Sequence, residues 1–87
     1  MEYKFNEKLI YRAADEIVFD TGKGVLIELN ETGNKIVSLI INGYSVAEII
    51  NSFSKEYPDS TIDEIRIMVE EFITQAVQEG VLIETVK

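Results

Sequence analysis

The sequence predicts an α+β fold in which a three-stranded antiparallel sheet is followed by three helices, in the order βββααα. Two observations support this prediction. Short β-prone segments separated by turn residues fill the first third of the chain, and capped segments with helical spacing of apolar residues fill the rest. The length of 87 residues fits one domain that spans residues 1–87.

Three strands are expected at residues 9–13, 17–19 and 25–29. Polar residues 14–16 separate the first two strands, and the Thr-Gly-Lys-Gly segment at 21–24 supplies turn chemistry before the third. No later segment is obviously ready to pair with the third strand. The sequence therefore predicts a free sheet edge there.

The first two helices are marked by the residues at their ends. Asn30 is a good N-cap for a helix whose apolar face lies within residues 36–41, and the Asn-Gly pair at 42–43 ends it. Ser45 and Glu48 form a capping box that opens the second helix, which ends at Pro58.

The third helix is longer and carries the most informative pattern. It is expected to begin after Thr61 and to end at Gly80, after which residues 81–83 form an extended tail. At about 100° per residue, one apolar stripe is predicted to face the core; it contains Ile62, Ile65, Val69, Ile73 and Ala76. Met68 and Phe72 extend this stripe sideways. They form either the rim of an ordinary core or one wall of a groove whose other wall is the third strand.

The composition disfavours an enzyme. The chain has no cysteine and no histidine, which excludes thiolate zinc sites, thiol nucleophiles and histidine bases. Carboxylates adjacent on a helix, as at 63–64 and 70–71, diverge by about 100° and do not converge on a metal ion. The Gly-Lys-Gly segment at 22–24 is too short for a phosphate-binding loop. We therefore expect neither catalysis nor a cofactor or metal, with a minimal carboxylate enzyme as the weakest alternative.

The net charge of −8 disfavours binding to nucleic acids and anionic membranes, and favours a basic partner. The three helices with attached strands resemble a winged helix-turn-helix, yet five acids accompany Arg66 alone across residues 61–80. No apolar run approaches the roughly 20 residues that span a bilayer, and the first residues lack a signal-peptide pattern. We therefore expect a cytoplasmic protein with no nucleic-acid and no membrane partner.

An ordered set of apolar, capping and glycine positions resembles the PqqD-like family. The matching residues are Leu29-Asn30-Glu31-Thr32-Gly33, Ile36-Val37, Asn42-Gly43, Ser45-Val46-Ala47-Glu48-Ile49-Ile50, Val69, Phe72-Ile73 and Gly80-Val81-Leu82. The resemblance covers roughly residues 17–84. This family includes the recognition elements that bind leader peptides in pathways for ribosomally synthesised, modified peptides (RiPPs).

The resemblance implies a winged helix-turn-helix-like fold and a non-catalytic adaptor. Such a domain binds the leader segment of a precursor peptide and presents its core segment to a modifying enzyme. The leader adds as a strand to residues 25–29 and lies in the cleft beside the third helix. The predicted peptide-binding residues on the strand are Val25, Leu26, Ile27, Glu28 and Leu29. Ile65, Met68 and Phe72 are predicted to lie opposite them, with Glu64 and Glu71 bordering the groove.

The sequence departs from the family pattern before the third strand. The Pro-Glu pair of many cofactor-pathway members is absent, and Lys23-Gly24 stands in its place. The short chain looks closer to the stand-alone recognition proteins of lasso-peptide clusters, whose partner is a separate leader peptidase. A radical SAM (S-adenosylmethionine) peptide-modifying enzyme is the alternative partner within the family. An acidic winged-helix module that binds or regulates another protein is the alternative from a different class.

Overall fold

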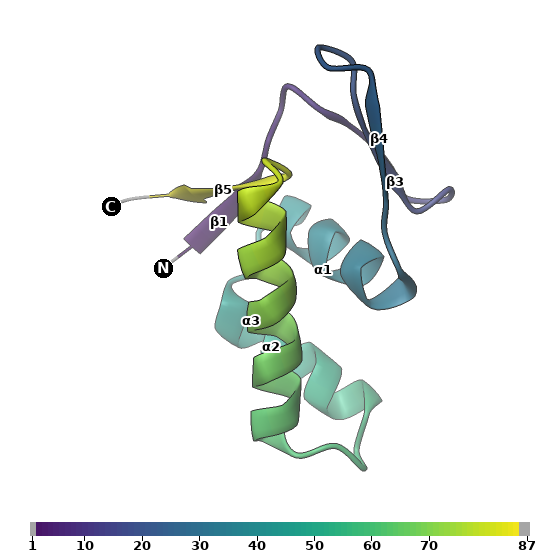
Figure 1. Ribbon diagram of the computed structural model, residues 1–87. Coiled ribbons are helices and arrows are strands. Elements are labelled where there is room, and N and C mark those ends of the chain that lie inside the picture. The colour runs from purple at the N-terminus through teal and green to yellow at the C-terminus, as the bar shows by residue number, and fades with distance from the viewer. Residues whose placement is uncertain (1, 86–87) are drawn as a thin grey trace.

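The computed structural model describes residues 2–85, and it confirms an α+β fold with an antiparallel three-stranded sheet and three helices (Figure 1). The strands are β1 (Glu2–Phe5), β2 (Ile10–Arg12), β3 (Ile17–Asp20), β4 (Val25–Glu28) and β5 (Leu82–Thr85). The helices are α1 (Glu31–Ile41), α2 (Val46–Glu56) and α3 (Ile62–Gln78).

The predicted order βββααα omits two strands. β1 was not predicted, and the residues expected to form an extended tail belong mostly to β5, which pairs antiparallel with β1 in a separate two-stranded sheet. Glu2 lies opposite Thr85 in this sheet, and Phe5 lies opposite Leu82. Each strand of this pair has its partner at the far end of the chain, so no local turn signal marks the pairing.

The three-stranded sheet has the order β2-β3-β4, and both pairings are antiparallel. The loops 13–16 and 21–24 each end in a residue with positive φ, Glu16 at 54° and Gly24 at 66°. This left-handed conformation turns the chain back into the next strand. β4 has β3 as a neighbour on one side only, which confirms the predicted free edge within the described residues.

The structure confirms the N-caps predicted for the three helices. The Asn30 side chain accepts a hydrogen bond from the Gly33 N–H at 2.7 Å, and both Ser45 with Glu48 and Thr61 with Glu64 form capping boxes. The backbone N–H of Thr61 donates to the Glu64 carboxylate, which lowers the pKa of Glu64. The first turns of all three helices are therefore fixed by side chains that were visible in the sequence.

The core lies between the helices and is closed by one strand from each sheet. Val18 of β3 and Leu82 of β5 are fully or almost fully buried, as are Phe53 of α2 and the α3 residues Ile65 and Val69. The predicted α3 stripe is confirmed except for Ile62, which is 47% exposed. Ile62 is the first residue of α3 and lies one turn before Ile65, the first buried residue of this helix. The buried stripe therefore begins at Ile65. No helix among residues 2–85 is long and apolar enough to cross a bilayer.

Candidate functional site

A groove runs along α3, with β4 and the first turn of α1 as its other wall. Three adjoining hollows form it. Phe72 and Gln75 line both the hollow at β4 and the middle one, whereas Glu64 and Met68 line both the middle hollow and the one near the α2–α3 connection. Because neighbouring hollows share lining residues, we treat them as one continuous feature, the α3 groove.

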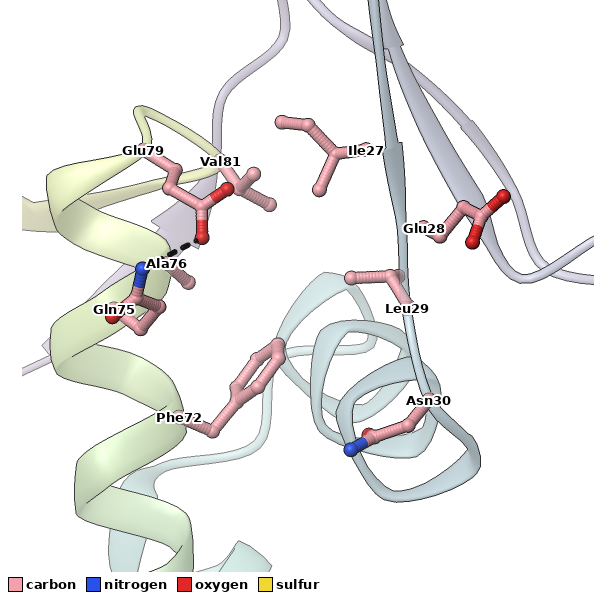
Figure 2. A pocket seen from close by; sticks show the side chains of 9 residues that line it. All are labelled: Ile27, Glu28, Leu29, Asn30, Phe72, Gln75, Ala76, Glu79 and Val81. Atoms are coloured by element: carbon pink, nitrogen blue, oxygen red, sulfur yellow. Dashed lines mark hydrogen bonds between the residues drawn. The ribbon is translucent and has the colours of Figure 1, made fainter.

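The section of the α3 groove beside β4 has an apolar floor. Ile27 and Leu29 point from β4 toward α3, and Phe72, Ala76 and Val81 lie on the facing side (Figure 2). Glu79 accepts a hydrogen bond of 3.1 Å from the Gln75 side-chain amide at the edge of this floor. The section thus combines a surface for apolar side chains with a polar rim, an arrangement typical of specific binding sites.

The free edge of β4 presents unpaired backbone groups. The Leu29 N–H donates to the Glu16 carbonyl at 2.8 Å, and Ile27 lies opposite Val18. In an antiparallel pair, alternate residues direct their N–H and C=O groups at the partner strand. Ile27 and Leu29 therefore bond toward β3, whereas Leu26 and Glu28 direct their N–H and C=O groups away from it. An extended peptide can form main-chain hydrogen bonds with these two residues.

The strand residues predicted for the site divide between two faces. Ile27 and Leu29 lie on the α3 side and pack against the core. Val25 and Leu26 are 45% and 50% exposed. The Glu28 carboxylate points to the opposite side of β4 from α3 (Figure 2), although Glu28 is among the residues that line the groove. Glu28 is therefore poorly placed to put charge into the α3 groove.

On α3, the structure brings Met68 and Phe72 together along the groove, and both also pack against the core. Both residues thus form the rim of the core. Phe72 also faces β4 across the hollow beside that strand, whereas the hollows that Met68 lines contain residues from the start of α1 and none from β4. Ile65 is only 2% exposed and lines the hollow near the α2–α3 connection, so it is mainly a core residue. Glu64 and Glu71 are exposed and border the middle section.

Sequence reasoning missed nine residues that line the groove: Asn30, Thr32, Tyr57, Ser60, Ile67, Gln75, Ala76, Glu79 and Val81. A signal existed for two of them. Positions 68, 72, 75 and 79 recur at helical spacings of four, three and four, so the line through Met68 and Phe72 continues to Gln75 and Glu79. Asn30 and Thr32 reach the groove only because α1 begins beside α3, which no local pattern reveals. Within residues 2–85 no cluster of carboxylates has the grouping needed to hold a metal ion.

Comparison with known proteins identifies the family. The sequence profile of the PqqD family, described as coenzyme PQQ synthesis protein D, matches residues 16–82. The chain belongs to the PqqD family. This confirms the family predicted from the ordered pattern of caps, glycines and apolar residues. No curated protein sequence is similar enough to this PqqD-family chain to count as a match.

Two solved structures have nearly the same fold as this PqqD-family chain. One is described as lasso peptide synthetase B1 complexed with the leader peptide; it has a TM-score of 0.85 and 19% identity, covering 97% of this chain and 100% of the other. The second is TbiB1 in complex with the TbiA(beta) leader peptide, with a TM-score of 0.84 and 17% identity, covering 97% and 99%. At such identities the likeness is one of fold.

Proposed function

We propose that this PqqD-family chain is a non-catalytic adaptor that binds the leader segment of a ribosomally synthesised precursor peptide. The leader adds as a strand to the free edge of β4 and lies in the α3 groove, and its core segment is presented to a modifying enzyme or leader peptidase. The observation that carries the proposal is the free edge of β4 opening directly onto an apolar groove. Strand addition of this kind combines main-chain hydrogen bonds with side-chain pockets.

The two similar structures support the same function, since each is described as holding a leader peptide on this fold. Their descriptions favour a leader peptidase of a lasso-peptide pathway as the partner, and the family match keeps a radical SAM enzyme as the alternative. We further propose that the fold is of the winged helix-turn-helix type, with α2 and α3 as the helix pair and β2–β4 as the wing. We also propose that residues 1–87 form a single domain and that it acts in the cytoplasm, where precursor peptides are synthesised.

Amide hydrogen exchange tests the proposal directly. The first step is to search beside the gene for this chain for a short reading frame that resembles a precursor, and the probe is a synthetic peptide corresponding to the N-terminal half of its product. The amides of Leu26 and Glu28 should exchange at least about tenfold more slowly in the complex, because only these β4 amides gain a new acceptor. The amides of Val25 and Ile27, already bonded toward β3, should change less. Protection confined to α2 would place the peptide elsewhere and contradict strand addition.

A further inference from the structure

The first turn of α1, part of one wall of the α3 groove, contacts both the three-stranded sheet and α3. On the sheet side, the Asn34 side-chain amide donates to the Ala13 backbone carbonyl at 3.1 Å, and the Tyr11 hydroxyl donates to the Asn34 backbone carbonyl at 3.0 Å. On the other side, buried Gly33 lies against the ring of Phe72 from α3. This helical turn therefore connects the sheet that contains β4 with α3.

The contact between Gly33 and Phe72 leaves no space for a side chain. A Cβ atom added at Gly33 would lie 2.5 Å from Phe72 Cε1 and 3.1 Å from both Phe72 Cδ1 and Asn30 Oδ1. The ring would have to move, because Cβ atoms essentially never approach another heavy atom to 2.5 Å. The Phe72 ring points from α3 toward α1 across the start of the groove (Figure 2).

The backbone conformation does not explain the glycine. Gly33 lies inside α1 and, unlike Gly24, Gly43 and Gly80, it does not have a positive φ. Alanine is the better helix former. The absence of a side chain at this position is thus explained by the close approach of Phe72.

We propose that Gly33 is a positioning residue of the α3 groove. Because it has no side chain, the Phe72 ring lies against α1, and the space between β4 and α3 stays open for an extended peptide. This inference rests on the proposed function and deepens it, since Phe72 lines both the hollow beside β4 and the middle hollow. A side chain at position 33 would push the ring toward the space that the peptide needs.

A mutant cycle on the full chain tests this inference. The probe is the tightest-binding peptide selected from a random 12-residue display library against the wild-type protein. Gly33→Ala should weaken its binding at least about tenfold in the wild-type background. The same substitution should cost less than about twofold in the Phe72→Leu background, because the smaller side chain removes the clash. Ser38→Ala, on the same helix but outside the groove lining, should leave the affinity unchanged.

Fluorine NMR gives a readout that does not depend on a ligand. The chain contains four phenylalanines, so labelling with 4-fluorophenylalanine gives four resonances, and Phe72→Leu identifies that of residue 72. Gly33→Ala should shift the Phe72 resonance and leave the other three in place. Ser38→Ala should shift none of them.

Each outcome decides the inference. Wild-type affinity in Gly33→Ala, an equal loss in both backgrounds, or an unmoved Phe72 resonance overturns it. If Gly33→Ala does not fold, Gly33→Ala with Phe72→Leu should fold, and failure of both overturns it. If the wild-type protein selects no peptide, the proposed function fails, and the fluorine shift alone then supports or overturns the positioning role of Gly33.

Discussion

At the scale of single residues, Met68 is the cleanest probe of the α3 groove. It is half-buried, lines two of the three hollows and is less deeply involved in the core than Ile65 or Val69. Met68→Ala should weaken leader binding by about 1–2 kcal/mol, or about 5- to 30-fold, as expected for an apolar anchor. Isothermal titration calorimetry measures this loss. Ile62→Ala is the control, because Ile62 is an exposed apolar residue of the same helix outside the groove lining; equal losses in both variants would count against the groove.

Glu16 shows how a single backbone angle affects stability. Its φ of 54° is in the left-handed region, which costs a residue with a side chain roughly 1–2 kcal/mol. Glu16→Gly removes this strain but adds freedom to the unfolded chain, so we expect a net gain of up to about 1 kcal/mol in the free energy of unfolding, measured by urea denaturation. Gly24→Ala makes the opposite change in the matching loop and should destabilise by about 1 kcal/mol. A less stable Glu16→Gly protein would contradict this account.

At the scale of secondary structure elements, the register of β4 separates binding from folding. Leu26→Pro removes an N–H that bonds to nothing in β3, so the sheet should stay intact while peptide binding is lost. Ile27→Pro removes an N–H directed at β3 and should unfold the hairpin. Circular dichroism melting reports the fold, and fluorescence anisotropy of a labelled peptide reports binding. A folded Leu26→Pro protein with full affinity would show that the peptide does not pair with β4.

The three helices were predictable because their signals are local. Asn30, Ser45 and Thr61 cap their helices through hydrogen bonds to backbone groups three residues away, and the α3 stripe repeats every three or four residues. The β1–β5 sheet was missed because its partners lie about 80 residues apart. For the same reason Val81 and Asn30 could not be assigned to the groove, since only the packed fold brings them to Phe72.

At the scale of the whole molecule, the net charge of −8 can speed the association of a basic peptide in two ways. The attraction comes either from the whole acidic surface or from the acidic residues at the groove alone. Glu71 and Glu79 line the α3 groove, whereas Glu7 and Glu84 do not. A leader peptide carrying two lysines should associate about two- to tenfold more slowly with a Glu71→Lys/Glu79→Lys protein at low ionic strength, measured by stopped-flow fluorescence. Glu64 is not used for this test, because its carboxylate also caps α3.

The double variant Glu7→Lys/Glu84→Lys changes the net charge by the same amount and serves as the control. A smaller effect of this pair would show that the groove itself is electronegative. Equal slowing by both pairs would show that the whole acidic surface attracts the peptide. In 0.15 M salt, where the Debye length is about 8 Å, the effect of either pair should be much reduced.

The pairing of β1 with β5 has a consequence for how this fold can be built into larger proteins. Glu2 and Thr85 lie opposite each other in the two-stranded sheet, and Figure 1 shows β1 and β5 on the far side of α3 from β4. A domain whose first and last strands lie side by side can be inserted into a surface loop of an enzyme with little entropic cost of loop closure. It can also be circularly permuted through a short linker. Either arrangement would keep β4 and the α3 groove clear of the junction, so a tethered enzyme could act on a peptide bound at the proposed site.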